Sequence, residues 1–276
     1  MHGLGNDYIV IDDRRESIEE KSLPRLAMRL CKRGSSVGAD GLLLVRESKD
    51  ADIRMRIFNL DGSEAEMCGN GIRCIAKYCY DNGVVQRKMM DVETLAGIRR
   101  VEILAEKKNS ADVRTEMGTP SFKREDIPFV GRGECIDEPI TIDGTTLNVT
   151  CVSMGNPHCV TFINDLETFP VQLVGSKLEK HPHFPEGTNV EFVTVQGKER
   201  ISIRTWERGV GETPACGTGA CASVVAAHRL GKTGKRVNVT LLGGNLLVGL
   251  GPTVTLEGSV EKIFEGQLFD GVLYGD

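Results

Sequence analysis

Hydrophobic and polar residues alternate along this chain with two different periods, one typical of strands and one typical of helices. A period of two, which is typical of half-buried strands, marks segments such as 53–59 and 200–206. Helical spacing of apolar residues marks four further segments, 23–33, 71–80, 171–180 and 220–230. The second and fourth of these are apolar nearly all round, which indicates helices that are buried inside a sheet.

Turn residues separate the remaining strands. Glycine and asparagine divide 89–117 and 236–257 into three strands each, and Asp143-Gly144 closes a hairpin over 139–152. The segment 118–138 has no regular pattern and several Pro and Gly residues, so it is expected to cross between domains. Other strands are expected at 8–11, 42–45, 159–163 and 190–195, with one more pair within 259–276.

The arrangement occurs twice in the chain. Asn6 and Asn156, each followed by a strand, are 150 positions apart, and Cys68 and Cys216 are 148 positions apart. This period is too long for a solenoid repeat and indicates an internal duplication. We therefore expect two similar domains, each burying one apolar helix in a sheet, with a pseudo-two-fold axis that brings both cysteines to one cleft. Their expected bounds are 1–116 with 264–276 for the first and 117–263 for the second.

Composition and charge narrow the class of protein. The 276 residues are 40% hydrophobic and 26% charged, as in soluble globular proteins. The net charge of -5, without a dense Lys/Arg block, argues against a nucleic-acid partner, and no apolar run approaches the ~20 residues of a transmembrane helix. Nine cysteines without a signal peptide indicate a reducing compartment and a cytoplasmic location. No Cys-x-x-Cys pair occurs, so no metal site is expected.

Two short stretches carry the candidate chemistry. Residues 67–74 and 215–221 each place a cysteine directly before a Gly-x-Gly turn at the start of a buried helix. The unpaired N–H groups and the helix dipole at such a position lower the pKa of a thiol and form a cradle for a carboxylate. Two such thiols suit racemisation or epimerisation, in which one group removes a proton and the other returns one from the opposite face. Neither a Rossmann nor a Walker motif occurs, so no nucleotide-binding fold is expected.

Motifs along essentially the whole chain resemble those of one family, diaminopimelate epimerase. They lie at 1–7 (MHGLGND), 58–63, 67–74, 153–158 and 207–220. The resemblance implies an enzyme with no cofactor that uses two cysteines to convert LL-2,6-diaminopimelate to the meso form, in the pathway to lysine and peptidoglycan. It also implies a homodimer and an α+β (mixed α/β) fold of two pseudo-symmetric domains. Each domain would be a curved, mostly antiparallel sheet wrapped around a central helix.

The same resemblance assigns roles to individual residues. Cys68 and Cys216 are similar to the two catalytic acid/bases, and His158 and Glu207 resemble residues that tune the thiols. Glu207 and Arg208 also resemble the pair that binds the remote amino and carboxylate groups of this small amino-acid substrate. The other expected substrate-binding residues are Asn6, Asn59, Asn156 and Asn189, and the backbone cradles Gly69 with Asn70 and Gly217 with Thr218.

Two departures from the family pattern change the expectation. Gly41 stands where some members have a substrate-contacting glutamine, so that contact is not expected here. The chain also begins at Met1, a few residues later than many members, so either the first strand is short or Met1 is not the natural start.

Two other functions fit parts of the pattern. A related cofactor-independent racemase acting on proline, hydroxyproline or another amino acid would use the same two thiols. Asn70 and the Glu207-Arg208 pair, however, favour a substrate with a distal amino-acid group. A cysteine-rich metal-binding or redox module would instead hold stoichiometric zinc that is lost with Cys68→Ser.

Overall fold

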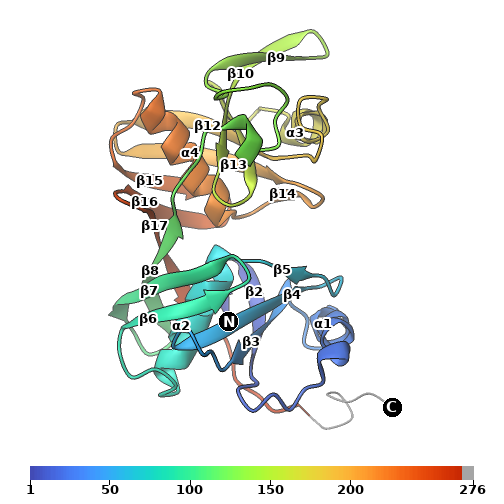
Figure 1. Ribbon diagram of the computed structural model, residues 1–276, viewed down its shortest axis with the longest axis vertical. Coiled ribbons are helices and arrows are strands. Elements are labelled where there is room, and N and C mark those ends of the chain that lie inside the picture. The colour runs from blue at the N-terminus through green and yellow to red at the C-terminus, as the bar shows by residue number, and fades with distance from the viewer. Residues whose placement is uncertain (269–276) are drawn as a thin grey trace. The chain divides into compact units, whose positions relative to one another are not determined.

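The computed structural model describes residues 1–268, which fall into two compact units (Figure 1). The first unit contains Met1–Thr115 and the chain from Gly258 onward, and the second contains Glu116–Glu257. The first boundary, after Thr115, lies one residue before the expected one at 116, and the second, at Gly258, lies six residues before the expected one at 264. The chain passes into the second unit within β8 (Ser110–Gly118) and returns within β17 (Val254–Glu261).

The first unit contains two helices, the strands β1 to β7, most of β8 and the last part of β17. The helices are α1 (Leu23–Cys31) and α2 (Gly69–Asp81), preceded by a short 3-10 turn at Glu20–Ser22. Strands β2 and β3 pair in parallel, as do β4 and β6, and the other pairs named in this unit are antiparallel. Its strands before β8 are β1 (His2–Gly3), β2 (Asn6–Asp12), β3 (Gly41–Arg46), β4 (Ile53–Asn59), β5 (Glu64–Ala65), β6 (Met89–Thr94) and β7 (Gly97–Glu106).

Strand β3 shows how the first core is built. All six of its residues are buried, because a helix covers each face. Leu42 and Leu44 pack in the cluster with α1, whereas Leu43 and Val45 pack in the cluster with α2. The prediction of a buried helix over 71–80 is therefore confirmed, with two further residues at its N-terminus and one at its C-terminus.

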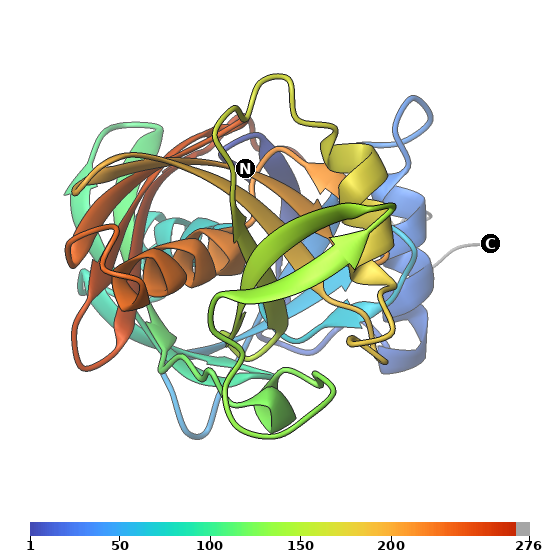
Figure 2. The ribbon, with the colours of Figure 1, turned by 90° about the horizontal axis from the view of Figure 1, so that it is seen from above.

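The second unit repeats this order of elements. Its helices are α3 (Val171–Glu179) and α4 (Gly217–Arg229), with a 3-10 turn at Arg124–Asp126. Figure 2 shows α4 enclosed by the curved strands of this unit, whereas α3 lies outside them. Its strands before β17 are β9 (Glu138–Ile142), β10 (Thr145–Ser153), β11 (Pro157–Phe162), β12 (Asn189–Gly197), β13 (Arg200–Glu207), β14 (Gly211–Thr213), β15 (Arg236–Leu241) and β16 (Gly244–Leu250).

The strand pairings confirm the internal duplication. The parallel pairs β2–β3 and β4–β6 of the first unit correspond to β11–β12 and β13–β15 of the second. The register is kept as well, since Ile53 faces Val92 in one unit and Ile201 faces Val239 in the other. Each unit is thus a mostly antiparallel sheet around one buried helix, as the sequence predicts.

Two segments differ from the expectation. Residues 118–138 are irregular apart from the 3-10 turn, but they are part of the second core, where Ile127 and Cys135 are fully buried. The crossing between the units falls in β8 instead. The expected strand pair within 259–276 is wrong for 262–268, which contain no strand; residues 269–276 lie outside the described chain. Ile263 and Phe264 are 57% and 65% exposed, so no core face orders them into a strand.

Candidate active site

The two cysteines occupy equivalent positions at the N-termini of the buried helices. Cys68 is the N-cap of α2, and its Sγ accepts the amide hydrogen of Gly71 at 3.5 Å. Cys216 is the N-cap of α4, and its Sγ accepts the amide hydrogen of Gly219 at 3.4 Å. Both residues have the extended backbone typical of an N-cap, so each thiol takes the place of a Ser or Asp cap.

The second glycine of each Gly-x-Gly turn is explained by close packing. A Cβ at Gly71 would lie 3.1 Å from Cδ2 of Leu43, and one at Gly219 would lie 2.6 Å from Oε1 of Glu191. Any side chain at position 219 would therefore displace a buried carboxylate. The motif thus lets strands β3 and β12 approach the helix ends that carry the thiols.

A hydrogen-bonded chain of side chains surrounds the first thiol. The hydroxyl of Tyr8 lies 2.9 Å from Sγ of Cys68 and donates to Oδ1 of Asn6 at 2.6 Å. Asn70 also donates to Oδ1 of Asn6, at 3.2 Å, and its own Oδ1 accepts from Arg73 at 2.6 Å. The hairpin turn between β1 and β2, with positive φ at Leu4 and Gly5, leads directly into Asn6. The first half-site (Asn6, Tyr8, Cys68 and Asn70) therefore unites three of the predicted residues.

The other two predicted features of the first unit lie on neighbouring strands. Asn59, at the end of β4, is exposed and donates to Oγ of Ser63 at 3.0 Å, within the turn to β5. Gly41 pairs with Asn59 on one side and with Tyr8 on the other. A Cβ at Gly41 would lie 2.9 Å from the carbonyl oxygen of Phe58 and 3.1 Å from the Tyr8 ring. Glycine at this position therefore makes room for Tyr8, which excludes a glutamine without movement of its neighbours.

Cys216 has the same backbone position as Cys68, at the N-terminus of a buried helix, but different side-chain neighbours. Thr218 Oγ1 lies 3.5 Å from Sγ of Cys216 and accepts from Nδ2 of Asn156 at 3.3 Å. Oδ1 of Asn156 lies 2.9 Å from Nε2 of His158, whose Nδ1 lies 2.8 Å from Oε1 of Glu191. His158 and Glu191 are both fully buried. The second half-site (Asn156, His158, Cys216 and Thr218) thus contacts the buried carboxylate of Glu191 through His158.

Glu207 controls the charge around Cys216. It interacts electrostatically with the thiol and accepts a hydrogen bond from the hydroxyl of Thr213. Burial raises the pKa of Glu207 above its usual value, Thr213 opposes this shift, and the charge of Glu191 adds to it. Burial also raises the pKa of Cys216 well above its usual range, and the charges of Glu207 and Glu191 add to that increase. The pKa-lowering effect expected from the helix N-terminus is thus outweighed at this cysteine.

Arg208 lies in the turn between β13 and β14, and Asn189, the first residue of β12, lies next to this turn. The side-chain amide of Asn189 donates to the carbonyl oxygen of Pro157 at 2.9 Å and accepts from the backbone amide of Arg208 at 2.9 Å. The exposed guanidinium of Arg208 donates to the carbonyl oxygen of Glu186 at 3.1 Å. Asn189 therefore holds the backbone that carries Glu207 and Arg208.

Comparison with known proteins identifies the family. The family model of diaminopimelate epimerase matches residues 1–123 and 150–257, which include both half-sites. The chain belongs to the diaminopimelate epimerase family. This is a family of isomerases, in agreement with the resemblance seen in the sequence.

Individual relatives extend over nearly the whole chain. The diaminopimelate epimerase of Pelotomaculum thermopropionicum is 49% identical over 269 residues, 96% of each chain, and that of Moorella thermoacetica is 48% identical over 270 residues, also 96% of each. Among solved structures, a PhzF-family phenazine biosynthesis protein of Bacillus anthracis has a TM-score of 0.68 at 19% identity, covering 97% of this chain and 95% of its own. A probable proline racemase of Agrobacterium radiobacter has a TM-score of 0.67 at 18% identity, covering 98% and 92%. These two structures show the fold alone.

Sequence reasoning missed three residues of this diaminopimelate epimerase family member: Tyr8 of the first half-site, Glu191, which contacts His158, and Thr213, which contacts Glu207. Tyr8 looked like a core residue of a strand, Glu191 had no motif around it, and Thr213 lies inside the motif at 207–220 but had no role implied for it. The duplication carried a signal for the first, because Tyr8 follows Asn6 by two residues, as His158 follows Asn156. No comparable signal marks Glu191, since Leu43 occupies its equivalent position 148 residues earlier.

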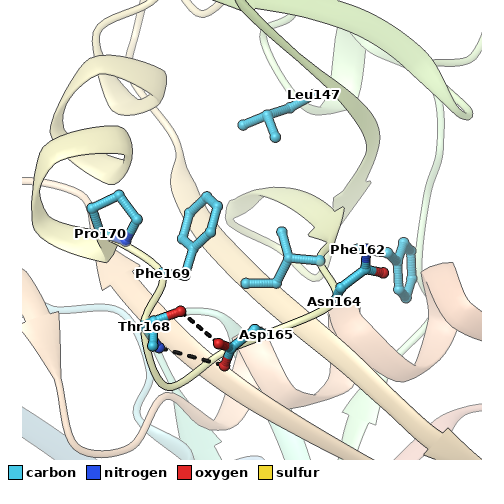
Figure 3. A pocket seen from close by; sticks show the side chains of 8 residues that line it. Leu147, Phe162, Asn164, Asp165, Thr168, Phe169 and Pro170 are labelled. Atoms are coloured by element: carbon cyan, nitrogen blue, oxygen red, sulfur yellow. Dashed lines mark hydrogen bonds between the residues drawn. The ribbon is translucent and has the colours of Figure 1, made fainter.

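Other features of the described chain lie away from the half-sites. Figure 3 shows a hollow of about 430 Å³ in the second unit, in which Asp165 accepts hydrogen bonds from Thr168. It is lined by Leu147, Phe162, Ile163, Asn164, Asp165, Thr168, Phe169 and Pro170, none of them a predicted site residue. Within residues 1–268, no group of three His, Cys, Asp or Glu side chains is placed to hold a metal ion, and no helix is long and apolar enough to cross a membrane.

Proposed function

We propose that this protein interconverts LL-2,6-diaminopimelate and meso-diaminopimelate by two-base proton transfer between Cys68 and Cys216, without a cofactor. The observation that carries the proposal is the pair of thiols at equivalent helix N-termini, in a chain of the diaminopimelate epimerase family. The product would serve lysine and peptidoglycan precursor biosynthesis, as the family resemblance implies.

The proposed reaction balances its protons within the protein. One sulfur, as the thiolate, takes the α-proton, and the other, as the thiol, gives a proton to the opposite face of the same carbon. One S–H bond forms as the other breaks, and the configuration inverts. The amides of Gly69 and Asn70, and of Gly217 and Thr218, would hold the reacting carboxylate and stabilise the charge that develops on it.

The neighbours of Cys216 support its role as an acid/base. Its thiol proton faces the carboxylate of Glu207, whose raised pKa makes it a stronger base than an exposed glutamate. Thr218 accepts from Asn156, so its own hydroxyl hydrogen is free to donate to the sulfur once the thiolate forms. His158 acts on this sulfur through Asn156 and Glu191 and not by direct contact.

Exchange with solvent deuterium tests the proposed reaction. LL-diaminopimelate and, separately, proline are incubated with the protein in D₂O without added cofactor. We expect deuterium at the α-carbon of meso product from the first turnovers, while unreacted LL substrate still carries hydrogen, because the two faces exchange with different sulfurs. Deuterium in recovered LL substrate before any meso product forms would contradict two bases, and exchange of proline alone would favour the racemase function.

Substitution of either cysteine tests the pair. Cys68→Ala and Cys216→Ala are each expected to lower kcat by at least the ~10²–10⁴-fold that one general acid/base contributes. Cys79→Ala, which removes a buried thiol from the middle of the first core, is the control and should retain activity. Substantial epimerisation by either of the first two variants would contradict the proposal.

We also propose a cytoplasmic location and a homodimer with no nucleic-acid or membrane partner. None of the nine cysteines, all of which lie within residues 1–268, forms a disulfide, which suits a reducing compartment. The dimer rests on the family resemblance, and light scattering of the purified protein tests it: the mass of a single chain at all concentrations would refute it.

A further inference from the structure

We infer that Glu179 is a positioning residue for Arg208. Its carboxylate fixes the turn from which the guanidinium binds the far carboxylate of the substrate, the one on the carbon that does not react. The inference rests on the proposed function, because diaminopimelate is a substrate with such a second carboxylate. It is argued from hydrogen bonds within the second unit that exist with or without a substrate.

Both carboxylate oxygens of Glu179 accept hydrogen bonds from the segment that carries Arg208. Glu179 is the last residue of α3, which packs against β13 and β14 (Figure 1), and it is only 8% exposed. Oε2 accepts from the indole Nε1 of Trp206 at 2.6 Å, and Oε1 accepts from the backbone amide of Gly209 at 3.0 Å. One side chain thus connects the end of a helix to residues on both sides of Arg208.

The helix itself is not stabilised by a carboxylate at this position. The carbonyl groups at the C-terminus of a helix carry partial negative charge, so an acidic residue in the last turn is unfavourable. Burial of a carboxylate adds a further cost unless hydrogen bonds offset it. The N–H groups of Trp206 and Gly209 supply those bonds, so the turn and not α3 explains why a glutamate stands here.

Arg208 is held at its backbone and along its side chain. Its amide donates to Oδ1 of Asn189 at 2.9 Å, and its guanidinium donates to the carbonyl oxygen of Glu186 at 3.1 Å. Gly187, with a φ of +72°, leaves room for the side chain, since a Cβ there would lie 3.1 Å from Cδ of Arg208. A guanidinium has several N–H donors, so one bond to Glu186 leaves others for a carboxylate.

The duplication provides an internal comparison. The residues 148 positions earlier lie at equivalent points of the first unit, where β3 and β4 pair in the same register as β12 and β13. All three side chains of the arrangement differ there: Cys31 stands in place of Glu179, Phe58 in place of Trp206 and Leu60 in place of Arg208. The carboxylate, the indole and the guanidinium therefore occur together in the second unit and not at the equivalent positions of the first, as expected if they act together.

Glu207 is held in place by bonds that do not involve Glu179. It pairs with Gly211 between β13 and β14 and accepts a hydrogen bond from the hydroxyl of Thr213. The bond from Gly209 to Glu179 lies beyond this pair, at the tip of the turn. Loss of the Glu179 carboxylate should therefore weaken the binding of the far carboxylate by Arg208 and leave the surroundings of Cys216 unchanged.

Amide hydrogen exchange tests the hold on the turn without any substrate. Glu179→Leu fills a similar space but accepts from neither donor, whereas Glu179→Gln keeps one acceptor oxygen. We expect the Gly209 amide to exchange about 10-fold faster in Glu179→Leu, because a hydrogen bond to a charged group is worth roughly the free energy of a tenfold change, and to show a smaller effect in Glu179→Gln. An unchanged rate in Glu179→Leu would overturn the inference. If neither variant folds, the wild-type protein decides: protection of the Gly209 amide supports the inference, and exchange at the rate of an unstructured peptide overturns it.

Kinetics separates the positioning of Arg208 from a general structural role. In Glu179→Leu, KM for LL-diaminopimelate should rise about 10-fold while kcat changes less than ~2-fold, since the binding of a remote group that is equal in ground and transition states affects KM alone. Lysine is diaminopimelate without the far carboxylate, so its inhibition constant should stay the same. A fall in kcat as large as the rise in KM, or an equal rise in the inhibition constant of lysine, would overturn the inference.

One control and one separation of outcomes complete the test. Glu167→Gln, in the exposed loop before α3, should leave both the Gly209 exchange and KM unchanged. A wild-type protein without epimerase activity would refute the proposed function, and the amide exchange would still decide whether Glu179 holds the turn. Epimerisation together with unchanged Gly209 exchange in Glu179→Leu would refute this inference alone.

Discussion

At the level of single residues, the duplication preserves the thiols but replaces their neighbours. Asn59 in the first unit corresponds to Glu207 in the second, and Leu43 corresponds to Glu191, each 148 positions later. The second unit has thus acquired two carboxylates close to its sulfur, and the first has none in these positions. Two half-sites with one backbone frame therefore place different side chains beside their sulfurs.

The raised pKa of Glu207 predicts how stability changes with pH. Above the usual carboxyl value of 4.5, the folded protein keeps the Glu207 proton that the unfolded chain has lost, so the free energy of unfolding falls as pH rises towards the folded pKa. Glu207→Gln removes this pH-dependent loss of stability, because glutamine does not titrate. Measured by urea unfolding from pH 4.5 upward, the variant should gain stability relative to wild type as pH increases, by about 1.4 kcal/mol per unit of pKa difference.

The same variant should lose epimerase activity, because an amide cannot accept the Cys216 proton. Glu199→Gln, in an exposed turn of the same unit, is the control and should follow the wild-type curve. A stability difference that stays constant or shrinks as pH rises would contradict the raised pKa.

Residue-level prediction from the sequence succeeded where a motif is repeated and failed where only a contact defines the role. The cysteines, their glycines and Asn6 stand in motifs that occur twice, so their grouping could be expected. Tyr8 lies in an apolar strand, and its hydroxyl becomes important only because Gly41 lets the ring lie between β3 and the thiol. Such a contact depends on strand register, which the hydrophobic pattern fixes only after the fold is known.

At the level of elements, the outer helices show how the two units differ in packing. Helices α1 and α3 have the same length and are shifted by 148 positions. Ala27 of α1 corresponds to Gly175 of α3, and Phe58 corresponds to Trp206. A Cβ at Gly175 would lie 2.7 Å from Cβ of Trp206. The second unit therefore combines a smaller helix residue with a larger ring, and the first unit does the reverse.

This complementarity predicts a coupled pair of substitutions. Gly175→Ala should destabilise the protein by about 1–3 kcal/mol through overpacking against Trp206, despite the better helix propensity of alanine. Phenylalanine keeps the Cβ and Cγ atoms that the new methyl meets, but its smaller ring has room to shift, so in the background of Trp206→Phe the same change should cost less. Urea unfolding of the two single variants and the double variant gives the coupling energy.

Gly251→Ala is the control for this cycle. A Cβ there would meet only the carbonyl oxygen of Thr253 at 3.6 Å, so we expect little change in stability. Strictly additive effects of Gly175→Ala and Trp206→Phe would refute the packing argument. Trp206→Phe also removes the 2.6 Å hydrogen bond from Trp206 to Glu179, but this loss occurs in both the single and the double variant and cancels in the coupling energy.

Periodicity predicted nearly every element, and the errors lie at ends. Helices α2 and α4 begin two and three residues before the expected 71 and 220, because their first turns contain glycines that lower the apparent helix propensity. The capping thiols compensate for this low helix propensity, because they accept the amide hydrogens of Gly71 and Gly219. The tail beyond β17 was expected to form strands from its apolar residues, but a pattern of apolar residues orders a strand only where a sheet has a face left to cover.

At the level of the whole molecule, the chain passes from one unit to the other within a strand on both occasions, first in β8 and then in β17. The boundary at Glu257 falls inside β17, so the first half of this strand belongs to the second unit and the last part to the first. Leu256 and Val260 are both fully buried, four residues apart on the same strand. Val260 packs in the core cluster that contains α2. Their positions allow the cores of the two units to be perturbed separately by nearly adjacent changes.

If each unit is stabilised by its own core, these two changes should act on different helices. Leu256→Ala, with an expected cost of about 2–5 kcal/mol, should lower the hydrogen-exchange protection of α4 more than that of α2. Val260→Ala removes fewer atoms, so its cost should be smaller, roughly 1–3 kcal/mol, and it should lower the protection of α2 more than that of α4. Each variant serves as the control for the other. If either change lowered the protection of both helices equally, the units would open as one cooperative structure, and the duplicated half-sites could not differ in local stability.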